Sequence, residues 1–290
     1  MSIGKMGVVG AGMMGAEIAL IFALVGKSVL LNDTSQSSLD RAMESLSSVL
    51  DAGISRGFWS EEDKPKALAN IFPTTNIEDF SDRDMVVEAV FEDKDVKSTV
   101  FKQLDNILHE DCIIASNTSS ISITVLSASL SDKRQGNFLG LHFFSPVHRM
   151  KLVEVISGMD TNQQALGIAT EACTEAGKVA IQVKDVVGFA VNRMLFALWN
   201  EALRLVEEGA CSIEDIDIGC KLGLGHPVGP FELMDLTSNT LNLQVGKILE
   251  GAYGDRFLPR PILKQIVAAG RVGRKSGRGW YRYDKKGQRK

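Results

Sequence analysis

The first two thirds of the chain alternate short apolar runs with segments whose apolar residues recur at helical spacing. Residues 3–9 form an apolar, β-branched run, and residues 16–25 resemble a buried helix that Gly26 ends. Further helices are expected over 39–50, from 60–63 and over 96–108, and strands over 28–31, 85–90, 112–115, 138–144, 152–156 and 179–183. Such alternation is typical of βαβ units. We therefore predict an α/β fold with a doubly wound, mostly parallel sheet.

The pattern changes after residue 185, where helical spacing replaces the alternation. Helices are expected over 189–206, from 212, over 233–249 and over 261–269. Pro230 suits the first position of a helix, and only residues 280–283 resemble a strand. The sequence thus predicts an α/β domain over 1–185 and an all-helical domain over 186–290. The apolar surface of the helical domain favours contact with a second subunit.

A glycine-rich turn follows the first strand directly and matches the pattern G-x-G-x-x-G. The turn and the acidic residue that ends the next strand comprise Gly10, Gly12, Met13, Met14, Gly15 and Asp33. Glycine permits the tight turn, the close approach of the backbone to a pyrophosphate and the packing of helix on strand. Free N–H groups at the start of the helix would meet the phosphate charge. This context favours a Rossmann-type, dinucleotide-binding domain.

Asp33 follows Gly15 by 18 residues, close to the spacing expected of a carboxylate that binds the adenosine ribose. Its charge would repel a 2′-phosphate, and neither of its chain neighbours, Asn32 and Thr34, is basic. The cofactor expected is therefore NAD, not NADP. The alternative is a glycine turn kept only for packing, with Asp33 capping a helix.

The composition excludes several classes of protein. Lys and Arg number 32 against 36 Asp and Glu, for a formal charge of −4, which argues against a nucleic-acid partner. An apolar fraction of 44% argues against disorder, and the longest apolar run, 18–25, is well short of the ~20 residues that span a bilayer. The start of the chain resembles a strand and no signal peptide, so a cytoplasmic location and reduced, mostly buried cysteines are expected.

The chain holds four histidines, of which His142 differs from His109, His148 and His226. It interrupts an otherwise apolar strand, as Glu154 does twelve residues later in the next strand. A buried polar group needs a partner, so the two predict a carboxylate–imidazole pair, either catalytic or purely structural. No spacing of ligands indicates a metal site.

Serines follow the strand at 112–115, in the run Ser116-Asn117-Thr118-Ser119-Ser120. Ligands of open α/β sheets bind outside the carboxyl ends of the strands, which makes Ser119 and Ser120 candidates for ligand contact. Runs of this kind are also common in turns and helix caps.

With these motifs together, the chain resembles the 3-hydroxyacyl-CoA dehydrogenase family, and within it the short-chain, 3-hydroxybutyryl-CoA type. The likeness spans nearly the whole chain. Besides the glycine turn and the two strands with His142 and Glu154, it covers residues 87–90, 116–120, 188–193, 226–230 and 273–277.

The resemblance implies reversible, NAD-dependent oxidation of an (S)-3-hydroxyacyl-CoA to the 3-oxoacyl-CoA by a homodimer. It implies that His142 is the general base, that Glu154 is its partner, and that Ser119 and Asn192 contact the substrate oxygen. The residues that it places against the cofactor, besides the glycine turn and Asp33, are Glu92, Lys97 and Lys275. Without the resemblance, both lysines would pass as surface charges.

The chain departs from the family pattern at a few positions. Ser145 and Asp93 stand where the family usually has asparagine, and the segment between Ser119 and His142 is two residues longer than usual. Two other functions are open: a dehydrogenase of a small hydroxy acid without CoA, and a non-enzymatic, NAD-binding protein like the lens crystallin relatives.

Overall fold

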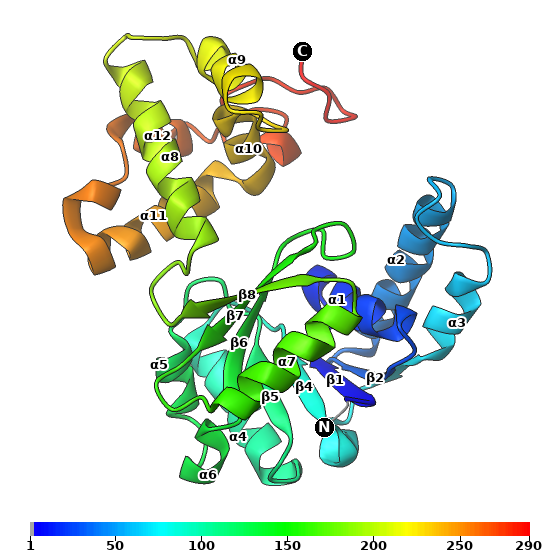
Figure 1. Cartoon of the computed structure of the whole chain (residues 1–290). Helices are drawn as coiled ribbons and strands as arrows, with labels where there is room; N and C mark the ends of the chain where they lie inside the picture. The colour runs from blue at the N-terminus through cyan, green and yellow to red at the C-terminus, as the bar shows by residue number, and fades with distance from the viewer. Residues whose placement is uncertain (1–2) are drawn as a thin grey trace. The chain divides into compact units, whose positions relative to one another are not determined.

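The computed structural model describes residues 3–290, which divide into two compact units, residues 3–189 and 190–290 (Figure 1). The division falls shortly after residue 185, where the sequence pattern changes. Phe189 is only 2% exposed and packs into a hydrophobic core of the first unit, which explains why the unit extends to it.

One eight-stranded sheet organises the first unit, in the order β3-β2-β1-β4-β5-β6-β7-β8. Every neighbouring pair is parallel except β6 and β7, which are antiparallel. The strands are β1 (Lys5–Val9), β2 (Ser28–Asn32), β3 (Ile71–Thr74), β4 (Met85–Glu88), β5 (Ile113–Ser116), β6 (Phe138–Phe143), β7 (Leu152–Ser157) and β8 (Val179–Lys184). The predicted doubly wound, mostly parallel sheet is confirmed. The sequence analysis missed only β3, a four-residue edge strand that contains Pro73 and exposes Phe72.

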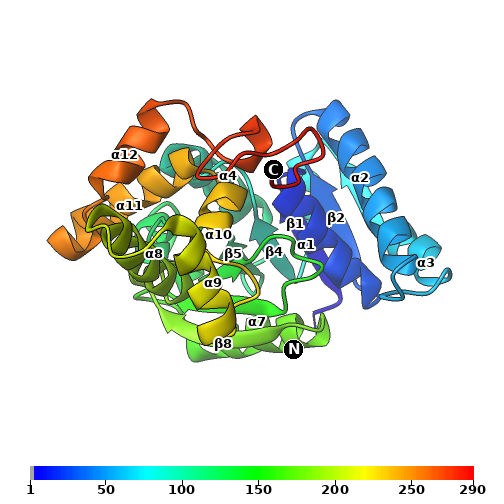
Figure 2. The same ribbon diagram turned by 90° about the horizontal axis from the view of Figure 1, so that it is seen from above.

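Helices cover both faces of this sheet (Figure 1). They are α1 (Met13–Leu24), α2 (Gln36–Ile54), α3 (Asp63–Ala69), α4 (Lys94–Ile107), α5 (Ile123–Ser127), α6 (Asp132–Gln135) and α7 (Gln163–Glu175), with a 3₁₀ turn at Ile77–Asp82. Side chains alternate between the faces of a strand, so the sheet separates two hydrophobic clusters. Val87 packs with α1, α2 and α7 on one face, and Val86 packs with α4 and α5 on the other. Helices α2 and α3 lie at the β2 end of the sheet (Figure 2).

The second unit has helices and no multi-residue strand within the described residues. It comprises α8 (Val191–Glu207), α9 (Ile213–Gly223), α10 (Pro230–Thr237), α11 (Asn239–Tyr253) and α12 (Pro261–Ala268), with 3₁₀ turns at Gly254–Phe257 and Arg274–Ser276. The helical C-terminal domain is thereby confirmed. The sequence predicts a short strand over residues 280–283. These residues make only isolated β-bridges, from Arg282 to Arg278 and from Tyr283 to Arg289.

The single helix expected over 233–249 is wrong, because the chain breaks at Ser238. This residue has a φ of +96°, and α10 ends before it while α11 begins after it. Asn242 donates its side-chain amide to the carbonyl of Met234 and accepts from Thr237 Oγ1, so side-chain hydrogen bonds stabilise the chain at the break. Polar side chains of this kind compete with helical hydrogen bonds. The apolar spacing runs on through the break and does not reveal it.

All four cysteines are free, and three are buried while Cys211 is exposed. Within residues 3–290, no helix is both long and apolar enough to cross a membrane.

Candidate active site

The glycine turn lies between β1 and α1 and leaves no space for larger residues at two positions. Gly10 has a φ of +103°, and a Cβ on it would lie 2.6 Å from the carbonyl oxygen of Ala89. A Cβ on Gly15 would lie 1.8 Å from the carbonyl oxygen of Gly10. Helix α1 therefore packs directly on the turn. Its N-cap, Gly12, supplies no capping side chain and the first turn holds no acidic residue, so no side chain of that turn competes with an anion for the free N–H groups.

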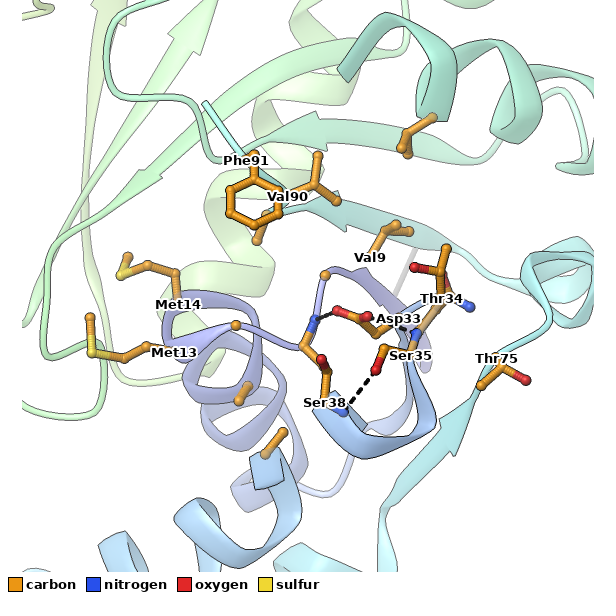
Figure 3. Close-up of a pocket in the computed structure, with 18 of the residues that line it drawn as sticks. Val9, Met13, Met14, Asp33, Thr34, Ser35, Ser38, Thr75, Val90 and Phe91 are labelled. Atoms are coloured by element: carbon orange, nitrogen blue, oxygen red, sulfur yellow. Dashed lines mark hydrogen bonds between the residues drawn. The ribbon is translucent and has the colours of Figure 1, made fainter. Parts of the chain in front are cut away.

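Asp33 is fixed to this turn by backbone hydrogen bonds. Its Oδ2 accepts from Ala11 N at 3.0 Å and its Oδ1 from Ser35 N at 3.0 Å (Figure 3). Ser35, and not Asp33, is the N-cap of α2, since its Oγ accepts from Ser38 N. The carboxylate thus lies beside the glycine turn, as a ribose-binding residue would.

A cavity of about 1100 Å³ opens beside the turn and Asp33. Met13 and Met14 border one side and Asp33, Thr34 and Ser35 the other (Figure 3). Ligand pockets commonly measure roughly 300–1,000 Å³, so the cavity suits a large ligand. A free helix N-terminus for a pyrophosphate and a carboxylate for a ribose, side by side, fit a dinucleotide.

A buried ion pair joins the carboxyl end of β4 to helix α4. Lys97 Nζ donates to Glu88 Oε1 at 2.6 Å, and these side chains are 1% and 0% exposed. Glu88 also accepts from Ser116 Oγ at 2.6 Å and from Val90 N at 2.7 Å. Burial raises the pKa of Glu88, and the Lys97 charge and these hydrogen bonds offset only part of that rise. Lys97 is therefore no surface charge, contrary to what its sequence context alone suggested.

Glu92 organises the loop that follows β5. Its Oε1 accepts from Thr118 Oγ1 at 2.6 Å, from Ser119 N at 2.9 Å and from Ser120 N and Oγ, each at 3.0 Å. Lys97 Nζ lies 3.4 Å from its Oε2. Burial acts to raise the pKa of Glu92, but the Lys97 charge and the loop hydrogen bonds outweigh it and lower that pKa. One lysine thus links the buried Glu88 to the carboxylate that holds Ser119.

His142 and Glu154 face each other across β6 and β7. They are register partners in the antiparallel pair, and His142 Nδ1 lies 2.7 Å from Glu154 Oε2. His142 is 4% exposed and Glu154 is fully buried. A carboxylate on Nδ1 fixes the neutral ring with its proton there, so Nε2 is the nitrogen that can take up a proton. The pair predicted from two polar intrusions therefore forms.

Asn117 joins this pair to the serine loop, a role that the sequence analysis missed. Its Oδ1 accepts from Phe143 N at 3.0 Å, directly after His142, and its own N–H donates to the carbonyl of Glu88. The signal was present in the run 116–120, but chain order does not reveal which strand lies next to β5. Ser119, His142 and Glu92 are in this way held by one connected network.

Two candidate residues belong to the second unit. Asn192 lies in the first turn of α8, and Lys275 lies in the turn Arg274–Ser276. Lys275 lines a smaller cavity of about 570 Å³ together with Arg274, Lys285 and Lys286. The first unit thus holds the glycine turn, Asp33, Glu92, Lys97, Ser119 and the His142–Glu154 pair.

Comparison with known proteins settles the family. The model of the 3-hydroxyacyl-CoA dehydrogenase NAD-binding domain matches residues 5–186, and the model of the C-terminal domain of the same family matches residues 188–283. The chain belongs to the 3-hydroxyacyl-CoA dehydrogenase family. Its first unit is the NAD-binding domain of that family, and the cofactor is NAD.

Relatives and solved structures agree over nearly the full length. The chain is 39% identical to a 3-hydroxybutyryl-CoA dehydrogenase of Clostridioides difficile, over 97% of this chain and all of that one. It is 38% identical to the mitochondrial hydroxyacyl-coenzyme A dehydrogenase of Sus scrofa, covering 95% and 90%. The crystal structure of (S)-3-hydroxybutyryl-CoA dehydrogenase from Ralstonia eutropha superposes with a TM-score of 0.94 at 42% identity, covering 98% and 100%.

The departures from the 3-hydroxyacyl-CoA dehydrogenase pattern have local structural roles here. Asp93 is the N-cap of α4, where its Oδ1 accepts from Asp95 N at 2.9 Å and from Val96 N at 3.0 Å. Ser145 precedes Pro146 through a cis peptide bond in the loop after β6. The longer segment contains the short helices α5 and α6.

His148 has a partner that the sequence analysis did not identify. Its Nδ1 lies 3.0 Å from Glu17 Oε2, and the ring centroid lies 6.0 Å from that of Trp59. Glu17 belongs to α1 and lines the large cavity. The loop after β6 is thereby tied to the helix that starts at the glycine turn.

Proposed function

We propose that this chain interconverts (S)-3-hydroxyacyl-CoA and 3-oxoacyl-CoA with NAD, and that its substrates are short, such as 3-hydroxybutyryl-CoA. The observation that carries the proposal is the buried His142–Glu154 pair on β6 and β7, in the same sheet whose strand β1 leads into the NAD-binding turn. Names of relatives over nearly full length support the CoA substrate.

His142 acts as the general base in the oxidation. Its Nε2 takes the proton of the 3-hydroxyl group as the carbonyl forms. NAD, when bound, would supply the acceptor for the hydride that leaves C3. Glu154 keeps the ring in the tautomer that accepts at Nε2 and stabilises the imidazolium by its charge. In the reverse direction the imidazolium returns the proton to the oxygen.

Ser119 and Asn192 orient the substrate oxygen, and positioning of this kind supplies much of what a protein contributes beside a cofactor. Ser119 suits this role because Glu92 accepts from its backbone N–H, which fixes the loop while leaving its hydroxyl to a ligand. For Asn192, in the first turn of α8, the family resemblance supports the same role toward the substrate oxygen.

The NAD contacts follow from the geometry of the glycine turn. The N–H groups around Gly12, Met13 and Met14 bind the pyrophosphate, and Asp33 accepts from the adenosine ribose hydroxyls. Glu92, Lys97 and Lys275 complete the cofactor site. Of these, Lys97 acts from behind the site, because its ammonium group is buried against Glu88.

The second unit also provides the contact between two copies in a homodimer. Support comes from large apolar side chains that its helices expose, including Met194, Leu222, Leu224 and Leu241. Exposed apolar surface of this extent is typical of an interface between subunits. The cytoplasmic location stays a prediction.

NADH consumption tests the proposal directly. Purified protein is supplied with acetoacetyl-CoA, with longer 3-oxoacyl-CoA esters and with free 3-oxo acids. We expect turnover of the short CoA ester and little of the free acids; preference for a free acid would favour the dehydrogenase without CoA, and no turnover at all would favour a non-enzymatic role. His142→Gln should lose about 10²- to 10⁴-fold in kcat while still binding NADH.

A further inference from the structure

A positively charged side chain lines the large cavity near Asp33, although the residues next to Asp33 in the chain are uncharged. Arg41 lies in the second turn of α2 and lines the same cavity as Asp33. Its guanidinium donates to Ser38 Oγ at 3.0 Å, and it forms no ion pair within residues 3–290. Helix geometry brings this charge back toward the end of β2, although it follows Asp33 by eight residues.

Hydroxyl groups accompany this cation. Thr34, Ser35 and Ser38 line the cavity beside Asp33, where Figure 3 shows them clustered at one side. Ser35 is the N-cap of α2 and Ser38 lies in its first turn, where the helix dipole adds a positive potential. A guanidinium with hydroxyl donors at a helix N-terminus is the chemistry that recognises a phosphate monoester.

Asp33 opposes that chemistry at the same place. Both of its carboxylate oxygens already accept backbone N–H groups, from Ala11 and Ser35, so its charge cannot move away from the cavity. A ribose hydroxyl can donate to this carboxylate, whereas a 2′-phosphate would meet its negative charge.

We propose that Arg41, with the hydroxyls of Ser35 and Ser38, forms a latent site for the 2′-phosphate of NADP, which the Asp33 carboxylate alone keeps closed. Cofactor selectivity of this chain then rests on one carboxylate acting against a cation already in place. The inference deepens the NAD site of the proposed function, and its test measures binding, so it is independent of whether turnover occurs.

The test compares dissociation constants of NADH and NADPH, measured by fluorescence titration or calorimetry. Asp33→Asn removes the charge but keeps an oxygen acceptor for the backbone. We expect it to tighten NADPH binding about tenfold, the effect of removing a repulsion near 1.4 kcal/mol. Adding Arg41→Gln to this variant should raise the dissociation constant of NADPH about fivefold or more relative to that of NADH. Lys102→Gln is the matched charge control, because Lys102 is an exposed cation of α4 outside the cavity lining. It should leave the dissociation constants of both NADH and NADPH unchanged.

A second arm does not depend on the Asp33 variant folding. Adenosine 2′,5′-bisphosphate and 5′-AMP are titrated against the unmodified chain and against Arg41→Gln. The variant should lose affinity for the bisphosphate by at least about threefold more than for 5′-AMP. Equal losses for the two nucleotides would overturn the proposal. So would an Asp33→Asn chain that binds NADH but gains no affinity for NADPH, or an undiminished gain in the double variant. Absence of NADH binding in the unmodified chain would refute the dinucleotide site itself, and this inference with it.

Discussion

Lys97→Met is the substitution whose effect follows most directly from the structure. It removes the cation from a pair in which both side chains are essentially inaccessible to water and the charged atoms lie 2.6 Å apart. Breaking a buried ion pair on one side costs about 3–5 kcal/mol, because the remaining charge is left without compensation. We expect the free energy of unfolding of the first unit to fall by about 3 kcal/mol or more at pH 8.

The loss should depend on pH, with a sign that the Glu88 carboxyl determines. Burial already raises the pKa of Glu88 above its ordinary value of 4.5, and removal of Lys97 raises it further. A group whose pKa is higher in the folded state holds a proton that the unfolded chain has lost, so stability falls as the pH rises above about 4.5. The variant should therefore be less impaired at pH 5 than at pH 8.

Urea unfolding followed by circular dichroism, with hydrogen exchange at the amides of β4, measures both effects. Lys102→Met on the same helix is the control, since its side chain is exposed. Glu88→Gln combined with Lys97→Met should recover part of the loss and remove its pH dependence. A cost below about 1 kcal/mol, or one equal at both pH values, would refute the view that a desolvated charge pair supports this part of the sheet.

Three other outcomes follow from the site. Glu154→Gln should lower kcat by about 10²- to 10⁴-fold, with NADH affinity retained, because the amide can leave the His142 ring in the wrong tautomer; a kcat within twofold would contradict that role. Gly15→Ala should abolish NADH binding or folding, since its Cβ would lie 1.8 Å from a backbone oxygen. Gly12→Ala, whose Cβ meets nothing within 4 Å, should keep the melting temperature and lose only affinity for NADH. Because folding lowers the pKa of Glu92, its stabilising effect is complete above pH 4.5 and is lost as the pH falls through its pKa in the folded protein. Glu92→Gln should therefore flatten the acid side of the plot of melting temperature against pH.

Much of the site could be predicted from sequence because its signals are local. The glycine turn and Asp33 lie within one βαβ unit, where spacing alone determines what adjoins what. His142 and Glu154 stood out because each interrupts an apolar strand, and a buried polar side chain requires a partner. These signals sufficed for the pair, although they did not reveal the direction of β7.

The features that sequence reasoning missed depend on contacts between elements. Lys97 lies on an amphipathic helix, where a lysine is ordinarily solvated, and only the position of Glu88 beneath it shows that it is buried. Arg41 could not be connected with Asp33 by inspection of chain neighbours, because the turn of α2 is what brings it to the cavity. The break at Ser238 left the apolar spacing intact, so periodicity could not show it.

The antiparallel pairing of β6 with β7 makes the geometry of the His142–Glu154 pair independent of the loop that joins the two strands. His142 and Glu154 are register partners, so the sheet ladder, and not residues 144–151, determines their separation. A shift of one residue within β7 would turn Glu154 to the opposite face, whereas residues added at the tip of the loop would leave the pair in place. This arrangement makes the loop a permissive position for evolutionary change, because insertions there leave the geometry of the proton-transfer pair unaltered.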